Sequence, residues 1–239
     1  MPQPFLTPHT PEAGLTIAKM LLDIKAVNLR PEQPYILTSG WAAPTYIDCR
    51  RVISFPQVRQ AITKYFAEQC AQIGMDKIDA VAGGETAGIP YSAWLAEALN
   101  KPMLYVRKKP KGFGRGAQIE GDFQNNKNVL LVEDLATDGA SKVAFVNALR
   151  DGGCTVTDCL VVFYYGVFPS SGELEKTGIN LRYLCSWPDI LRAATEGKYF
   201  PPTTVAAAQE FLHDPAGWSA AHGGASSANA KLSSHSGSK

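Results

Sequence analysis

A buried strand that runs into a pair of acidic residues constrains the fold of this chain most. Residues 129–132 are Val-Leu-Leu-Val, Glu133 and Asp134 follow, and a turn of small and hydroxyl-bearing residues leads into a helix. Strand, short turn and helix form the repeating unit of α/β proteins with a parallel sheet, in which ligands bind at the carboxyl ends of the strands. The segment therefore predicts the fold class and the place of a ligand site.

The composition of this turn favours binding of a phosphorylated sugar. Small residues let the backbone approach an anion, and the N–H groups at the helix start point at it with the positive end of the helix dipole. The acids suit ribose hydroxyls or the Mg²⁺ of a polyphosphate. An ordinary helix-capping junction is the alternative. The predicted donor site consists of Glu133, Asp134, Leu135, Ala136, Thr137, Asp138, Gly139, Ala140 and Ser141.

Strands and helices alternate along most of the chain. Apolar patterns predict helices at 12–27, 56–73, after 88 and at 141–150, and strands at 78–82, 103–106, 129–132 and 160–164. Smaller pieces at 170–213 complete the domain. We expect one α/β domain over residues 1–214, with a central mainly parallel sheet flanked by helices. Residues 215–239, rich in Gly, Ala and Ser, are expected to form a disordered tail.

Composition argues against several functions and locations. A formal net charge of +1 provides no basic field for nucleic acid or an anionic membrane. No apolar run approaches the roughly 20 residues that span a bilayer, and no signal-peptide pattern is evident. The five cysteines form no CxxC pair, which favours reduced thiols in the cytoplasm. No histidine lies between residues 10 and 212, which argues against a His-dependent hydrolase or metal centre.

A cationic, glycine-rich stretch at 107–121 is the second chemical segment. Its cations are Arg107, Lys108, Lys109, Lys111 and Arg115. Such a loop can close over a diphosphate leaving group, exclude water and neutralise its charge. A solvated surface loop is the alternative interpretation.

Two further segments could complete a site. Residues 81–90 form a glycine-bearing turn in which Thr86 and Ala87 could meet a second phosphate, although tight βα turns also need glycine for their geometry. Residues 35–50 are extended and aromatic, and could cover a planar ring as a hood at about 30–55. An edge hairpin with buried aromatic side chains is the alternative there.

Together the four segments resemble the orotate phosphoribosyltransferases of the type I phosphoribosyltransferase family. The 129–141 stretch is similar to the family's phosphoribosyl diphosphate signature, and 107–111 to its catalytic loop. Residues 38–48 are similar to its hood, and 82–90 to its diphosphate loop. The resemblance, over about 12–213, implies transfer of the phosphoribosyl group from phosphoribosyl diphosphate to orotate. The products would be orotidine 5′-phosphate, a precursor of pyrimidine nucleotides, and diphosphate.

The resemblance also implies roles for individual residues and a cofactor. Catalysis is expected from Lys111, Arg107, Lys108 and Asp134. The donor would contact Arg107, Lys108, Lys111, Thr86, Ala87 and the 133–141 segment. Orotate would contact Thr38, Ser39, Tyr46, Thr137 and Tyr165. Mg²⁺ is expected mainly on the diphosphate, without a firm protein ligand. A homodimer with shared active sites is implied, and neither nucleic acid nor membrane is an expected partner.

The chain departs from the family pattern at four places. Thr38 stands where Lys is frequent, Phe113 where a loop His is frequent, and Asp138 where a second Thr is usual. Tyr164-Tyr165 occupies the place of an Asp-Arg pair whose Arg holds the orotate carboxylate. The alternatives are a phosphoribosyltransferase for another nucleobase and a non-catalytic regulator that binds phosphoribosyl diphosphate. A dinucleotide-binding enzyme is disfavoured, because residues 83–84 do not complete a GxGxxG motif.

Overall fold

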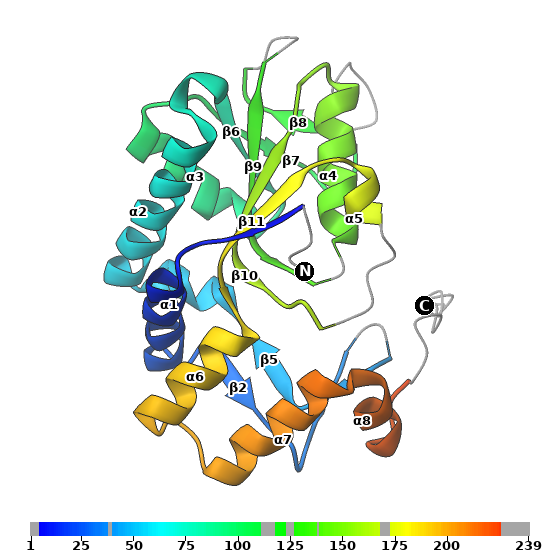
Figure 1. Ribbon diagram of the computed structural model, residues 1–239. Helices are drawn as coiled ribbons and strands as arrows, with labels where there is room; N and C mark the ends of the chain where they lie inside the picture. The colour runs from blue at the N-terminus through cyan, green and yellow to red at the C-terminus, as the bar shows by residue number, and fades with distance from the viewer. Residues whose placement is uncertain are drawn as a thin grey trace.

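A seven-stranded sheet forms the centre of the computed structural model, which describes residues 5–37, 40–110, 118–122, 127–137, 139–167 and 173–225. The strand order is β1-β11-β10-β9-β6-β7-β8, and every pair is parallel except β7 with β8 (Figure 1). The strands are β1 (Leu6–Pro8), β6 (Ala80–Gly84), β7 (Met103–Val106), β8 (Ile119–Glu120), β9 (Val129–Ala136), β10 (Asp158–Tyr164) and β11 (Asn180–Ser186). The predicted fold class is confirmed.

Helices cover both faces of this sheet (Figure 1). One face carries α1 (Pro11–Asp23), α2 (Pro56–Ile73) and α3 (Gly88–Leu99), and the other carries α4 (Ala140–Asp151) and α5 (Glu173–Lys176). Along β9, Leu130 and Val132 pack on the first face, whereas Val129 and Leu131 pack on the second. Because both faces are covered, the strand is apolar without alternation, as the sequence shows.

A hood lies at one end of the sheet (Figure 1). Its N-terminal part consists of two antiparallel pairs and a 3-10 helix: β2 (Val27–Leu29) with β5 (Thr45–Ile47), β3 (Tyr35–Ile36) with β4 (Ala42–Ala43), and η1 (Cys49–Ser54). Its C-terminal part consists of α6 (Trp187–Gly197), α7 (Pro202–His213) and α8 (Pro215–Ala221). A second 3-10 helix, η2 (Met75–Lys77), follows α2. The hood is therefore built from both ends of the chain.

The tail that we expected from residue 215 instead begins with helix α8. Trp218 of α8 is 8% exposed and meets the ring of Phe211 edge-on, with centroids 5.5 Å apart. The Ser219 hydroxyl accepts a hydrogen bond from the Ala42 backbone N–H at 2.9 Å and donates one to the Ala225 carbonyl at 2.6 Å. Ordered structure thus extends past residue 214, and residues 226–239 lie outside the described part.

The sequence placed the end of β9 too early. The strand runs to Ala136, so Glu133 and Asp134 lie within it and are 5% and 9% exposed.

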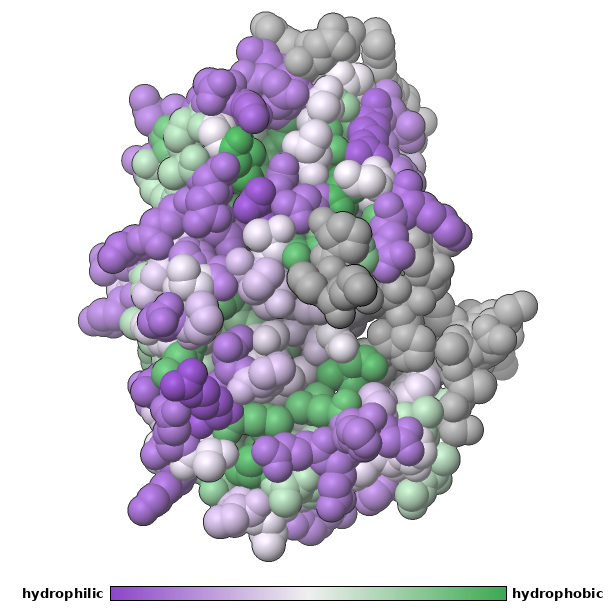
Figure 2. All heavy atoms as spheres, viewed as in Figure 1, coloured by the Kyte–Doolittle hydropathy of each residue, from purple (hydrophilic) through white to green (hydrophobic). Residues whose placement is uncertain are grey.

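The surface is hydrophilic over much of the face in Figure 2, with a band of hydrophobic side chains across the hood. Ile36 of the hood is a large apolar side chain that is 64% exposed. Among the described residues, no helix has the length and apolar character needed to cross a membrane.

Candidate active site

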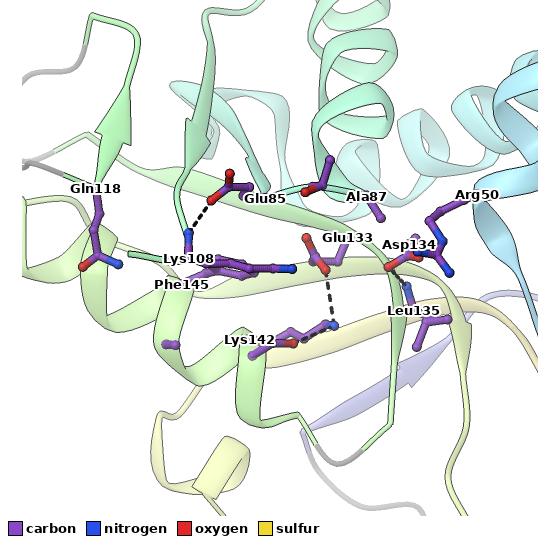
Figure 3. A pocket seen from close by; sticks show the side chains of 13 residues that line it. Arg50, Glu85, Ala87, Lys108, Gln118, Glu133, Asp134, Leu135, Lys142 and Phe145 are labelled. Atoms are coloured by element: carbon purple, nitrogen blue, oxygen red, sulfur yellow. Dashed lines mark hydrogen bonds and ion pairs between the residues drawn. The ribbon is translucent and has the colours of Figure 1, made fainter. Parts of the chain in front are cut away.

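A cavity of about 430 Å³ opens where β6, β7 and β9 end. The first turn of α4 and the hood element η1 complete its wall (Figure 3). Its lining residues are Arg50, Glu85, Thr86, Ala87, Lys108, Gln118, Glu133, Asp134, Leu135, Ser141, Lys142, Ala144 and Phe145. Parallel strands place their carboxyl ends on one edge of a sheet, which is where ligands bind in folds of this class.

Many of the predicted site residues meet in this cavity. Those that line it are Thr86, Ala87, Lys108, Glu133, Asp134, Leu135 and Ser141. Ala136 ends β9, and Thr137 and Gly139 follow it in the adjoining turn, but these three do not line the cavity. Ala140 begins α4. Lys111, Thr38, Ser39 and Asp138 lie outside the described residues, as does Phe113. Residues of three predicted segments, Thr86 and Ala87, Lys108, and Glu133 to Leu135 with Ser141, therefore lie around one cavity.

Glu133 forms a buried ion pair with Lys142. The Lys142 Nζ lies 3.3 Å from Glu133 Oε2, and the side chains are 6% and 7% exposed (Figure 3). The other carboxylate oxygen, Oε1, is buried without a hydrogen-bond partner. Burial raises the pKa of Glu133 to about 7, although Lys142 opposes this shift. The carboxylate is therefore held between a buried cation and close-packed backbone, and its pKa lies near neutral.

Asp134 is the second buried acid of the cavity. Burial raises its pKa, and the charge of Lys142 and a hydrogen bond from the Leu135 backbone N–H oppose the rise. That N–H donates to Asp134 Oδ1 at 2.8 Å. The backbone bond fixes the direction of this carboxylate beside Glu133 (Figure 3).

The turn after β6 is tied to the start of the cationic loop. Glu85 Oε2 accepts a hydrogen bond from the Lys108 backbone N–H at 2.7 Å (Figure 3). The Glu85–Thr86 peptide bond is cis. Arg107 does not line the cavity, because its guanidinium lies 3.4 Å from Glu120 and its N–H donates to the Gln118 carbonyl. Lys108 is thus the described loop cation that the structure brings into the site.

The hood contributes Arg50, which lies at the opposite end of the cavity from Gln118 (Figure 3). Its guanidinium contacts Asp48 Oδ1 at 3.2 Å and the Tyr46 hydroxyl at 3.3 Å. The buried Tyr91 hydroxyl donates to the Cys49 carbonyl at 2.6 Å and so ties α3 to η1. These bonds hold Arg50 on the side of the cavity where Asp134 lies.

The two tyrosines predicted to contact orotate do not line the cavity. Tyr46 packs against Tyr35, with ring centroids 5.2 Å apart, and its hydroxyl accepts from Arg50. Tyr165 is 6% exposed and donates its hydroxyl to the Thr45 carbonyl at 3.2 Å. Its ring also meets Trp187 edge-on. In this structure Tyr165 therefore contacts the hood, through Thr45 and Trp187.

Sequence reasoning missed six residues of the cavity: Arg50, Glu85, Gln118, Lys142, Ala144 and Phe145. Glu85 had a usable signal, since it stands directly before the predicted Thr86 and Ala87. Lys142 follows the predicted Ser141, yet nothing in the sequence says that its charge is buried. Arg50 and Gln118 come from separate parts of the chain and meet the site only through tertiary packing.

Comparison with known proteins places this chain in one family. No protein-family model matches it. An orotate phosphoribosyltransferase of Cereibacter sphaeroides (strain ATCC 17029) is 46% identical over 213 residues, which are 88% of this chain and 92% of the relative. The corresponding enzyme of Dinoroseobacter shibae is 47% identical over 217 residues, 90% and 96% of the two chains.

Solved structures of related proteins also resemble this chain in fold. The orotate phosphoribosyltransferase of Aeropyrum pernix superposes with a TM-score of 0.66 at 34% identity, over 76% of this chain and 99% of that one. The UMP synthase of Leishmania donovani, with a TM-score of 0.73 and 24% identity over 85% of this chain and 43% of its own, shares the fold. On sequence, fold and the convergence of its predicted motifs, the chain belongs to the orotate phosphoribosyltransferase family.

Proposed function

We propose that this protein transfers the 5-phosphoribosyl group from phosphoribosyl diphosphate to orotate, giving orotidine 5′-phosphate and diphosphate. One observation carries the proposal: the acid pair of β9, the turn at 85–87 and Lys108 line one cavity at the carboxyl edge of the sheet. Hydroxyl-binding acids, an anion-binding turn and a cation are what a diphosphorylated sugar requires.

The donor binds with its ribose over β9. Glu133 and Asp134 accept hydrogen bonds from the ribose hydroxyls, and their charges stabilise the electron-poor sugar as the bond from C1 to the diphosphate breaks. Backbone N–H groups of the turn at 137–141 hold the 5′-phosphate at the start of α4. Lys108 and the loop cations neutralise the departing diphosphate, while a ring nitrogen of orotate forms the new bond to C1.

We propose that Mg²⁺ binds together with phosphoribosyl diphosphate. Among the described residues, no three acidic, His or Cys side chains group as a metal site. Glu133, one of the acids of the cavity, already pairs with Lys142. These residues fit an ion held by the diphosphate and ribose hydroxyl oxygens of the donor. When bound there, Mg²⁺ supplies positive charge to the leaving group.

Lys111 is our candidate for the proton that the departing diphosphate takes up, because the loop carries no His. Lys111→Ala should lower kcat by about a hundredfold or more without changing the unfolding midpoint. Steady-state kinetics and a denaturant titration measure the two quantities. A near-normal kcat would remove this lysine from the chemistry.

Arg50 is our candidate for the orotate carboxylate, in the place of the absent Asp-Arg pair. A guanidinium recognises a carboxylate through two parallel hydrogen bonds. Arg50→Gln should raise KM for orotate roughly tenfold or more, and leave KM for the donor near its original value. Arg51→Gln is the matched control, since Arg51 does not line the cavity and its Nε donates to the Ile24 carbonyl. An equal change in both variants would contradict this role.

One assay tests the function itself. The protein is offered phosphoribosyl diphosphate and Mg²⁺ with orotate, uracil, hypoxanthine or adenine, and consumption of each base is followed. Orotate alone should be consumed rapidly. Preference for another base would support a different phosphoribosyltransferase, and turnover of no base despite donor binding would support a regulator.

Two further properties are proposed with this function. A homodimer in which the cationic loop reaches the neighbouring site follows from the family resemblance. The resemblance suggested Lys108 as the residue that crosses, whereas in this structure Lys108 lines the cavity of its own chain. A cytoplasmic location is consistent with the five cysteines, all of which are free and buried.

A further inference from the structure

Lys142 is a lysine that the fold buries at the edge of the cavity. It lies in the first turn of α4, is 5% exposed, and donates to Ser141 Oγ at 3.1 Å as well as pairing with Glu133 at 3.3 Å. A lysine is almost never buried unless it is paired. The position of this cation, at the positive end of a helix dipole, makes it still less favourable. Its pairing with Glu133 is the feature that offsets this cost.

We propose that Lys142 is a positioning residue for the donor substrate: it keeps Glu133 ionised and oriented so that the carboxylate can accept ribose hydroxyls. The inference rests on the proposed function and adds a residue to its donor site. Lys142 pairs with Glu133 Oε2, whereas Oε1 is buried beside Gly84 and Gly88. The pair and this packing therefore hold the carboxylate in one orientation on the lining of the cavity.

The surroundings of Glu133 explain why it needs a cation. A Cβ at Gly84 or Gly88 would lie 2.2 or 2.3 Å from Glu133 Oε1, so these turns press closely on the carboxylate and exclude water. Burial of this kind raises the pKa of Glu133 to about 7 even though Lys142 opposes the rise, so loss of Lys142 would favour the protonated form at neutral pH. A protonated carboxyl is a poorer acceptor for ribose hydroxyls and carries no charge for the sugar cation.

Other charges near Glu133 do not replace Lys142. Lys108 lowers the pKa of Glu133 less than Lys142 does, and Asp134 raises it. The titratable or charged groups around it are Lys142 of α4, Asp134 of β9, Lys108 after β7, Glu85 after β6, Arg50 of η1 and Cys159 of β10. Of the described cations, Lys142 alone is recorded in ion-pair contact with Glu133. Removal of Lys142 should therefore shift Glu133 towards its neutral form.

The first test is the pH profile of Lys142→Met, which keeps the length of the side chain and removes the charge. We expect the acid limb of kcat/KM for phosphoribosyl diphosphate to move up by at least about one pH unit. At pH 7 kcat/KM should fall about tenfold or more, and it should recover towards the wild-type value near pH 9. A loss that is the same at every pH would overturn the proposal, because it would reflect packing or a direct contact instead.

A double-mutant cycle separates action through Glu133 from direct contact with the donor. Glu133→Gln should lower kcat/KM and remove the acid limb, and adding Lys142→Met to it should cause no further loss. Losses that multiply would show that Lys142 acts on the donor independently, which contradicts a positioning role. The control is Lys64→Met, which breaks an exposed Lys64–Glu68 pair at 4.0 Å and should leave the profile unchanged.

A binding measurement keeps this inference separate from the acceptor assignment. Calorimetric titration with Mg²⁺ and phosphoribosyl diphosphate alone needs no nucleobase. Lys142→Met should weaken binding at pH 7 and regain affinity at higher pH. If orotate is not consumed but this pattern holds, the acceptor assignment fails and the role of Lys142 stands. If orotate is consumed and binding by the variant is unchanged at every pH, the role of Lys142 fails.

Discussion

At the scale of single residues, the buried Glu133 is central to the proposed donor site. Its carboxylate lies between two close glycine turns and one buried cation, so its charge is set by tertiary neighbours. The acid pair is local in sequence and was predicted from it. The partner Lys142 is also local, since it lies nine residues after Glu133 in the first turn of α4, but its burial is not a local property.

The raised pKa of Glu133 predicts how stability depends on pH. The folded protein holds this proton up to about pH 7, whereas an unfolded Glu releases it near its ordinary value of 4.5. Between these values the folded state binds more protons, so the contribution of Glu133 to the free energy of unfolding falls as pH rises. Glu133→Gln should remove this part of the decline.

Urea titrations at pH 5 and pH 7.5 measure the effect. The wild-type protein should lose more stability between these two pH values than Glu133→Gln does. An equal pH dependence in both proteins would mean that Glu133 titrates normally, and would weaken the argument for its buried charge. Glu68→Gln provides a control at an exposed acid.

At the scale of elements, the short turns that end β6 and β9 shape the site. Gly88 begins α3 where a Cβ would meet Glu133 Oε1 at 2.3 Å and the Val132 carbonyl at 2.5 Å. The sequence indicated that this turn needs glycine, but left open whether the reason was turn geometry or approach to a phosphate. The structure shows a further reason, which is close packing of α3 on β9.

At the scale of elements we also predict the effect of removing helix α8. A chain that ends after Asp214 lacks Trp218 and Ser219, whose contacts with Phe211 and Ala42 support the hood. We expect this truncation to destabilise the protein by about 3 kcal/mol, the usual cost of losing a large buried aromatic side chain. It should also raise KM for orotate.

A chain that ends after Ala225 keeps these contacts and is the matched control. Its stability and KM should match those of the full chain, as measured by urea titration and steady-state kinetics. If the chain that ends after Asp214 has the same stability and KM as the chain that ends after Ala225, α8 does not stabilise the hood.

At the scale of the whole molecule, the active site is assembled from distant parts of the chain. Arg50 comes from the hood, Lys108 from the β7–β8 hairpin and Glu133 from the central strand. Helices near the C-terminus complete the hood, where Trp187 of α6 meets the ring of Tyr165 and Ser219 of α8 accepts a hydrogen bond from the Ala42 backbone of β4.

Shared active sites in a homodimer can be tested by mixing inactive variants. Lys111→Ala removes a loop cation, and Asp134→Asn removes an acid of the donor site. If the loop of one subunit serves the site of its partner, a mixed dimer contains one site with both native groups and regains part of the activity. Absence of any recovery in mixtures that sedimentation shows to be mixed dimers would contradict shared sites.

Local patterns in the sequence were sufficient for strands β6, β7, β9 and β10, for helices α1 to α4, and for the acid pair and the glycine-bearing turns beside it, because periodicity and turn chemistry act over a few residues. They were insufficient for Arg50, for the buried charge of Lys142 and for the place of Tyr165 beneath the hood. They also missed helix α8, whose few apolar side chains become stabilising only against α7 and β4. Those features depend on contacts between segments far apart in the chain, and burial that arises only on folding determines their charge and role.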